Sequence, residues 1–334
     1  MWEPIANTPE VWAAVDRLAE APSPVPDRAL LAAYLASVRD DDSATTALED
    51  LVAAFDRGFA RVDLTGGLAG AAWVANHVAP DSEELLAACD ASLARALDAW
   101  KGPLDLTHGL VGIGIYFLDR EGDVAARARA RIVELLAERR RDGTWFTPRE
   151  ELHPDEQPHF PNGRVDCGIP HGVGGIAGLL RRMGGDATTL ADSTTRWLLA
   201  QLRDGGLPRA IVDGEPKPGR VAWCYGMPGA CLALGGPREL TGWLSVKPWQ
   251  TDTLALCHGA GGMMHMANRM YQATREPAYR VTALAWLEQL LARISEAPPG
   301  DLLDGSAGIA LALLAAATDL EPAWDRMLLC DVVG

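Results

Sequence analysis

The sequence predicts an all-α protein, a single α/α toroid in which helices of an inner and an outer layer alternate along the chain. Three observations support this prediction. Apolar residues recur with helical periodicity over most of the 334 residues, and period-two alternation is scarce. The motif Gly-x-x-Gly recurs six times, each time opening an apolar segment. Most of these segments are followed by an amphipathic segment rich in Arg and Glu, which is typical of a helix packed on one face.

Helical periodicity also marks segments outside the glycine motifs. We expect helices at Pro9–Glu20, Asp27–Val38, Thr46–Phe59, Glu83–Trp100, Val124–Arg140, Ala187–Leu202, Ala278–Ile294 and Pro322–Cys330. Asp27 is expected to cap its helix, because Asp is a favoured N-cap residue. Two stretches, at about 142–167 and 204–222, lack this periodicity and are predicted to be long loops, which in compact chains are often functional. A hairpin is predicted at Asp213-Gly214.

The glycine motifs define an internal repeat. The six copies begin at Gly67, Gly109, Gly172, Gly226, Gly259 and Gly305. They are separated by 42, 63, 54, 33 and 46 residues, and the mean of about 48 is close to the roughly 40–47 residues of helical-hairpin repeats. A helix that is apolar all round is buried, so the glycine-started helices are predicted to form the inner layer. The helices expected at Asp27–Val38 and Thr46–Phe59 would be a seventh hairpin without the glycines. We therefore expect residues 1–334 to form one domain.

Composition and charge exclude several classes of protein. The chain has 30 basic and 45 acidic residues, a net charge of −15, which disfavours binding to a phosphate backbone. No run of residues approaches the about 20 predominantly apolar residues of a transmembrane helix. The N-terminus carries Glu3 and Glu10 where a secretory signal has basic residues. We expect a cytoplasmic protein whose six cysteines stay reduced.

The residues just before the first glycine of each copy are suited to proton transfer or metal binding. The position immediately before it holds His108, His171, Tyr225, His258 and Asp304 in five of the six copies. The position before that holds Cys224 and Cys257 in adjacent copies, and Asp63 and Asp105 both lie four residues before their glycines. If the inner helices are parallel, all these residues lie at one rim. Helix N-termini also favour a thiolate over a thiol.

Cys224, Cys257 and His258 form a candidate zinc site. Two thiolates and an imidazole are zinc ligands, and three protein ligands with one open position are typical of catalytic zinc. The alternative is that both cysteines are core residues and that His258 is a hydrogen-bonded helix cap, because adjacent Cys and His are a weak motif.

Two of the motifs resemble a known family. The segments WCYGMPG at 223–229 and LCHGAGG at 256–262 resemble the lanthionine synthetase C-type cyclases, and the resemblance extends to HGVGG at 171–175 and to Asp105. It covers roughly residues 60–320. It implies a double toroid of seven inner and seven outer helices, with zinc held by Cys224, Cys257 and His258. The family's other functional positions match Asp105, His171, Arg220 and Tyr225.

The resemblance also implies a reaction and partners. The family's enzymes add a peptide cysteine to dehydroalanine or dehydrobutyrine by an intramolecular Michael addition, which closes a lanthionine or methyllanthionine ring. The implied substrate is a dehydrated precursor peptide with a leader and a core, and a dehydratase and an exporter are candidate members of a biosynthetic complex. We expect no extra small domain of the kind that some relatives insert.

Roles for the matching residues follow from their chemistry. His171 is the best candidate to protonate the enolate that addition creates, because its imidazole titrates near neutral pH. Asp105 would hold an imidazole in one tautomer, Arg220 would bind an enolate or a peptide carbonyl, and Tyr225 would offer a hydrogen-bond donor. Each also has a structural interpretation: a helix-start histidine, a helix cap, a solvated loop arginine and a packed tyrosine. His108 is a weaker candidate for proton transfer.

Two other functions remain open. The first is a glycoside hydrolase on an α/α toroid, which would use paired carboxylates. The predicted rim offers mainly Cys and His, with Asp63, Asp105 and Asp304 as its acids, which argues against it. The second is a zinc-dependent protein that binds thiols or glutathione without cyclase activity.

Overall fold

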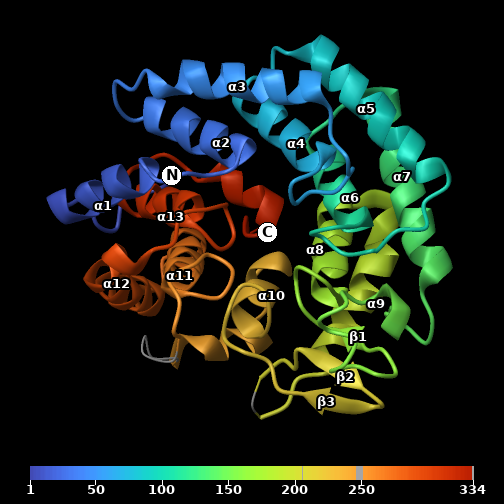
Figure 1. Ribbon diagram of the computed structural model, residues 1–334. Helices are drawn as coiled ribbons and strands as arrows, with labels where there is room; N and C mark the ends of the chain where they lie inside the picture. Colours follow the sequence, from blue (N-terminus) through green and yellow to red (C-terminus); the bar gives the residue numbers. More distant parts are fainter. Residues whose placement is uncertain (205, 246–250, 333–334) are drawn as a thin grey trace. The chain divides into compact units, whose positions relative to one another are not determined.

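Figure 1 shows the computed structural model, which describes residues 1–204, 206–245 and 251–332 and consists mainly of helices. Its backbone contacts divide the chain into two compact units. The first unit comprises Met1–Ala60, Val74–Asp81 and Trp243–Val332, and the second comprises Arg61–Trp73 and Ser82–Gly242. The single domain expected over 1–334 stays a prediction. Among the described residues, no helix combines the length and the apolar character that crossing a bilayer requires.

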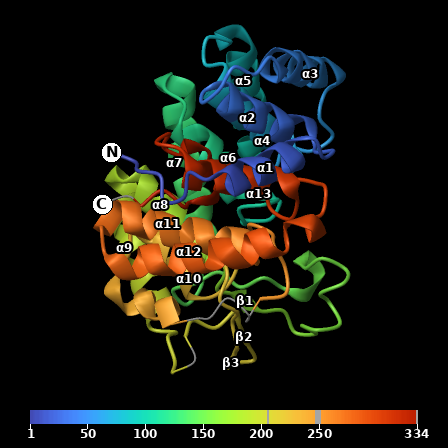
Figure 2. The same cartoon turned by 90° about the vertical axis from the view of Figure 1, so that its left-hand side faces the viewer.

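The first unit packs helices from both ends of the chain. Its α-helices are α1 (Pro9–Ala19), α2 (Val25–Ala36), α3 (Ser43–Arg57), α11 (Ala260–Thr274), α12 (Pro277–Ala292) and α13 (Ser306–Ala317), with 3₁₀ helices η5 (Ile294–Glu296) and η6 (Ala323–Leu328). α13 is buried along its whole length and contacts α1, α2 and α11. α3 packs on α2, which confirms the predicted hairpin without glycines. Figure 2 shows α11 and α12 side by side.

The second unit shows the predicted layers most clearly. Its α-helices are α5 (Glu83–Asp98), α6 (Leu110–Leu118), α7 (Gly122–Arg139), α8 (Val173–Met183), α9 (Thr188–Leu199) and α10 (Met227–Ala233), and α4 (Leu68–Val78) begins in it. The glycine-started helices α6, α8 and α10 are buried over most or all of their lengths. α5, α7 and α9 bury only one face, and α7 and α9 pack on α6 and α8 respectively.

The two predicted loops pair with each other. β1 (Val165–Asp166) comes from the first loop, and β2 (Ala210–Val212) and β3 (Glu215–Lys217) come from the second. They form an antiparallel sheet in the order β1-β2-β3, which confirms the hairpin at Asp213-Gly214. Leu152 and Phe160 pack with residues of β2 in a small core. Short 3₁₀ helices occur at Arg149–Glu151, Gly185–Ala187 and Arg238–Ser245, and Gly205 of the second loop lies outside the described residues.

The second glycine of every Gly-x-x-Gly motif lies against the main chain. A Cβ atom at this glycine would lie 1.8–2.3 Å from the carbonyl oxygen of the residue three positions before the first glycine, in all six copies. In α13, for example, a Cβ at Gly308 would lie 1.8 Å from the Leu302 oxygen. Only glycine allows this approach without moving the backbone. The repeat therefore records a packing requirement at the start of each inner helix.

The predicted N-cap role of Asp27 is wrong. α2 begins at Val25, because the prolines at 24 and 26 suit the first turn of a helix, and Asp27 therefore lies inside that turn and not at the N-cap. The Asp27 carboxylate instead accepts a hydrogen bond from the Leu302 N–H at 3.2 Å. The segment expected at 322–330 is the 3₁₀ helix η6, which ends where Leu329 adopts a left-handed conformation.

A buried ion cluster joins η6 to α11. The Asp325 carboxylate accepts hydrogen bonds from Nε of Arg269, at 2.7 Å, and from Nε2 of His265, at 2.6 Å. Burial raises the pKa of Asp325, but Arg269 and His265 outweigh burial and hold this pKa below its usual range. His265 is therefore a core residue of the first unit.

Replacing Gly308 with Ala tests the packing requirement at the helix starts. We expect Gly308→Ala to lower the free energy of unfolding by more than about 2 kcal/mol, because the added methyl group overlaps the Leu302 carbonyl. Urea unfolding followed by circular dichroism measures the change. Gly242→Ala is the matched control, because its Cβ would meet only the Met227 side chain at ordinary contact distance. Equal stabilities of the two variants would contradict the requirement.

Candidate active site

Main-chain hydrogen bonds join the segments that precede the inner helices of the second unit. The Thr65 N–H donates to the Thr107 carbonyl at 3.0 Å, and the Thr107 N–H donates to the Pro170 carbonyl at 3.3 Å. The Ile169 N–H in turn donates to the Cys224 carbonyl at 2.9 Å. These bonds bring corresponding positions of four successive motifs side by side. The predicted register of the motifs is therefore confirmed within this unit.

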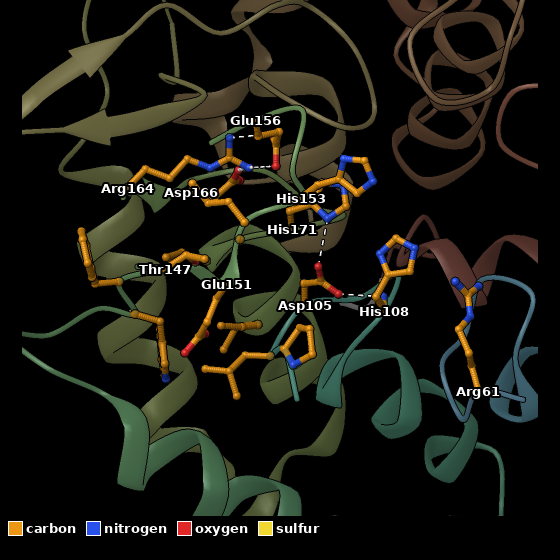
Figure 3. A pocket seen from close by; sticks show the side chains of 18 residues that line it. Arg61, Asp105, His108, Thr147, Glu151, His153, Glu156, Arg164, Asp166 and His171 are labelled. Atoms are coloured by element: carbon orange, nitrogen blue, oxygen red, sulfur yellow. Dashed lines mark hydrogen bonds and ion pairs between the residues drawn. The ribbon is translucent and has the colours of Figure 1, made fainter. Parts of the chain in front are cut away.

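Asp105 and His171 form a hydrogen-bonded pair at this edge. Nδ1 of His171 lies 3.0 Å from Oδ2 of Asp105, as Figure 3 shows. The other oxygen of Asp105 accepts a hydrogen bond from the His108 N–H at 2.7 Å. Asp105 thus serves as a local cap and as the partner of an imidazole at the same time, so the two interpretations of this residue are compatible.

His108 lies beside this pair. Its exposed ring is nearly parallel to that of His171, with 6.1 Å between the ring centroids. The Thr107 hydroxyl lies 3.0 Å from Nδ1 of His108 and 3.2 Å from Nδ1 of His171. Ligand-type atoms of Asp105, His108 and His171 all lie within 4.8 Å of one another. Because Asp105 and Thr107 already bond to the Nδ1 atoms, we interpret this group as an acid–base cluster.

The surroundings of His171 favour its protonated form. Burial lowers the pKa of His171, but the hydrogen bond and charge of Asp105, with the charges of Asp166 and Glu156, outweigh burial. The pKa of His171 therefore lies above its ordinary value. An imidazole held this way by Nδ1 presents Nε2 for proton transfer.

His171 and Asp105 face a cavity of about 630 Å³ (Figure 3). The first predicted loop contributes much of the wall, including Trp145, Phe146, Glu151, His153 and Glu156. The Phe146 side chain is 54% exposed, whereas Trp145 is buried and donates its indole N–H to the Leu136 carbonyl. The loop was predicted to be functional from its lack of periodicity, and it lines the cavity that holds the acid–base cluster.

A buried charge network that the sequence did not reveal reaches the same cavity. The Asp166 carboxylate is bound to Arg164 at 3.0 Å and accepts a hydrogen bond from the Tyr225 hydroxyl at 3.0 Å. Arg164 also binds Glu156 at 2.7 Å. Burial and the negative charge of Asp166 raise the pKa of Tyr225. Tyr225 was expected to offer a hydrogen-bond donor, and its hydrogen is directed to Asp166.

Arg220 is not brought into this cluster. Its side chain is exposed, and among the described residues it does not line the cavity. Its carbonyl oxygen lies where a Cβ at Gly226 would fall, so the backbone of this segment folds tightly against the start of α10. The binding role of the Arg220 side chain stays a prediction.

The three candidate zinc ligands are placed by the starts of two helices. Cys224 is buried just before α10 in the second unit, and Cys257 and His258 are half-buried just before α11 in the first. The Cys257 N–H donates to the Leu303 carbonyl at 2.9 Å, and Nδ1 of His258 lies 3.7 Å from Oδ1 of Asp304. A carboxylate on the Nδ1 side leaves Nε2 of His258 available to a metal. The donor set of two thiols and one imidazole fits zinc.

The sequence of the chain matches a known protein family. The family model described as "Lanthionine synthetase C-like protein" matches residues 28–236 and 243–329. The chain belongs to the lanthionine synthetase C-like family. The structure is also similar to that of a nisin cyclase, with a TM-score of 0.77 and 18% sequence identity, over 96% of this chain and 95% of the other. That similarity shows the fold and confirms the predicted α/α toroid.

Replacing Asp105 tests its hold on His171 in this lanthionine synthetase C-like protein. We expect the pKa of His171 to fall in Asp105→Asn, because the variant loses a carboxylate hydrogen bond and its charge. A pKa raised by folding stabilises the fold below the ordinary imidazole pKa, and this contribution is lost as pH rises through the raised value. NMR titration of labelled histidines measures the change, with the exposed His153 as an internal reference. An unchanged midpoint for His171 would contradict the pairing.

Proposed function

We propose that this protein is a zinc-dependent lanthipeptide cyclase, which closes thioether rings in a dehydrated precursor peptide. Membership of the lanthionine synthetase C-like family supports the proposal, as does the likeness to a protein named nisin cyclase. The observation that carries it is the His171–Asp105 pair, 3.0 Å apart and facing a cavity, at two positions that the family resemblance assigns to function. The proposed substrate is a peptide that carries both cysteine and a dehydrated Ser or Thr residue.

Cys224, Cys257 and His258 would hold the zinc. Bound by two thiolates and an imidazole, zinc would favour the thiolate form of a substrate cysteine, which is the nucleophilic form. Asp304, 3.7 Å from Nδ1 of His258, would help to orient that imidazole. The rest of the chemistry is assigned to side chains of the second unit.

His171 would carry the proton in this reaction. When the substrate sulfur bonds to the β-carbon of the dehydrated residue, the electron pair of the double bond moves toward the carbonyl and forms an enolate. The α-carbon must then gain a proton, and the thiol has lost one, so the reaction has no net uptake of protons. His171 would donate from Nε2 while Asp105 holds Nδ1–H, and its raised pKa favours the proton-bearing form.

Zinc content tests the ligand assignment. We expect about one zinc per chain in the purified protein and a loss of zinc in Cys257→Ala, since a site of three protein ligands would lose one of its thiolates. Elemental analysis measures the metal. Cys231→Ala, which removes a buried cysteine of α10 outside the proposed site, is the matched control and should keep its zinc. Undiminished zinc in Cys257→Ala would rule out this ligand set.

Chelation separates a catalytic from a structural zinc. We expect circular dichroism to keep most of its helical signal after zinc is removed, because the buried apolar helices stabilise the fold without the metal. Cooperative unfolding on mild chelation would instead indicate a structural site. Remetallation with zinc is the control for damage during chelation.

Replacing His171 tests the proton-transfer role. We expect His171→Asn to keep its zinc and to slow ring closure by about 10²–10⁴-fold, or to misplace rings, because the proton donor is lost. Thiol alkylation with mass spectrometry follows closure of a peptide with one cysteine and one dehydroalanine, and fragmentation locates the ring. His153→Asn, in the loop wall of the cavity, is the matched control. Thiol binding without ring closure by the unmodified protein would favour the non-cyclase alternative.

A further inference from the structure

We infer that Asp166 is a positioning residue of the proposed cyclase, which fixes the Tyr225 hydroxyl and gives His171 a second carboxylate neighbour. The inference deepens the proposed function and rests on it for the reaction. It concerns two functional positions that the sequence treated as independent. Figure 3 shows Asp105, Asp166 and His171 in the wall of one cavity.

Both carboxylate oxygens of Asp166 have hydrogen-bond or ion-pair partners. Its side chain is 2% exposed. Oδ1 accepts a hydrogen bond from the Gly168 N–H at 2.8 Å, and Oδ2 faces both Arg164 and the Tyr225 hydroxyl at 3.0 Å. Three donors therefore converge on two oxygens. Of these donors, the Arg164 guanidinium carries a positive charge and cannot accept a hydrogen bond, so the ion pair with Arg164 favours the ionised form of Asp166.

Arg164, which also binds Glu156, offsets part of the free-energy cost of burying a charge on Asp166. Burial outweighs the opposing effects of Arg164, His171, the Gly168 N–H and the Tyr225 hydroxyl, so the pKa of Asp166 lies above its usual value. Arg164 is itself buried and is shared between Asp166 and Glu156, whose side chain is partly exposed. A buried ion pair is weak evidence for stability, so its place beside the cavity is the observation that points to a function.

The second unit contains another network built from the same four residue types. There, Arg120 binds Glu83 and Asp90, and the Tyr116 hydroxyl donates to Asp90 at 2.6 Å. Its residues join α5 to the end of α6, and none of them lines the cavity among the described residues. The two networks share their chemistry and differ in location. Asp90 is therefore a matched structural control for Asp166.

The hydrogen bond to Asp166 also determines what Tyr225 offers a substrate. A phenol has one hydrogen, and here it is directed to a carboxylate, so the Tyr225 oxygen presents lone pairs only. Such an oxygen accepts hydrogen bonds, and the donors of a peptide are its N–H groups. Because this hydrogen is already donated to Asp166, we do not assign protonation of the enolate to Tyr225.

The electrostatic effect of Asp166 must be separated from those of its neighbours. Asp105, Asp166 and Glu156 all favour the charged form of His171. Other groups that contact His171 or line the same cavity are Thr107, His108, Arg61, Glu151, His153 and Arg164. Asp166 differs from Asp105 because it makes no hydrogen bond to His171 in the structure, so replacing it removes charge and leaves the Asp105–His171 bond in place.

NMR titration of His171 is the decisive experiment. It compares the unmodified full-length protein with Asp166→Asn, Asp90→Asn and Tyr225→Phe, all with labelled histidines, and His171→Asn identifies the resonance. We expect the titration midpoint of His171 to move to lower pH in Asp166→Asn only. Asp90→Asn should lower stability without moving the midpoint, and Tyr225→Phe should leave it in place because the Asp166 charge remains. An unmoved midpoint in Asp166→Asn, or an equal shift in Asp90→Asn, would overturn the inference.

Glu156→Gln covers the case in which Asp166→Asn does not fold. Glu156 is the partly exposed end of the network, and its replacement weakens the hold on Arg164 without opening the core. We expect a smaller shift in the same direction as that of Asp166→Asn. Absence of any shift in a folded Glu156→Gln protein would then count against the network.

Ring closure provides the second readout. The rates are compared at a pH below the titration midpoint of His171, where His171 is protonated in every variant. If Asp166 acts through Tyr225, Asp166→Asn and Tyr225→Phe should each slow ring closure. The double variant should then be only as slow as the slower single variant. Additive losses would overturn the link to Tyr225. The titration needs no peptide substrate, so a protein that shows the expected shift and closes no ring would refute the proposed function and leave the placement of Asp166 intact.

Discussion

The approach of the main chain to the second glycine of each motif is the contact on which the rest of the structure depends. A carbonyl oxygen lies where a Cβ would otherwise be in all six copies. The first N–H groups of a helix have no partner within it. Here the preceding segment supplies carbonyls in their place: the Gly112 N–H donates to the Asp105 carbonyl at 3.3 Å, and the Gly262 N–H donates to the Ala255 carbonyl at 3.2 Å. Because main-chain carbonyls cap these helices, most side chains just before them are not needed as N-caps and can make other contacts.

For this reason, titratable side chains can gather at one edge of the second unit. Successive pre-helix segments bond to one another through Thr65, Thr107 and Ile169, so residues at equivalent positions lie side by side. His171 thereby meets Asp105, although 66 residues separate them in the chain. One Asp105 oxygen still caps a turn and the other holds the imidazole. A residue that does both is more firmly placed than one that does either, which suits the orienting role proposed for Asp105.

The features that could be predicted from the sequence are those that follow from helical periodicity or from the glycine repeat. The inner helices and the layers follow from a repeat whose glycines are required sterically, as at Gly308. The repeat also placed Asp105 and His171 at one rim, without showing that they pair. The Asp166 network was missed because Glu156, Arg164 and Asp166 lie in a loop without periodicity, and Tyr225 is 59 residues from Asp166 in the chain. Asp27 was misplaced because two prolines set the helix start. Zinc binding was predicted from ligand chemistry and from the family resemblance, because the spacing of Cys224, Cys257 and His258 is a weak signal by itself.

The two Glu–Arg–Asp–Tyr networks show why residue types alone do not reveal a site. Both bury an aspartate, both neutralise it with an arginine shared with a glutamate, and both direct a tyrosine hydroxyl to the carboxylate. The one around Asp90 joins helices. The one around Asp166 has a cavity and a histidine with a raised pKa beside it, so the same carboxylate that stabilises its arginine also acts on a group that can exchange a proton. What distinguishes them is the neighbouring histidine. The repeat places His171 just before α8, and the short turn that follows Asp166, closed by the hydrogen bond from the Gly168 N–H, brings the two residues together.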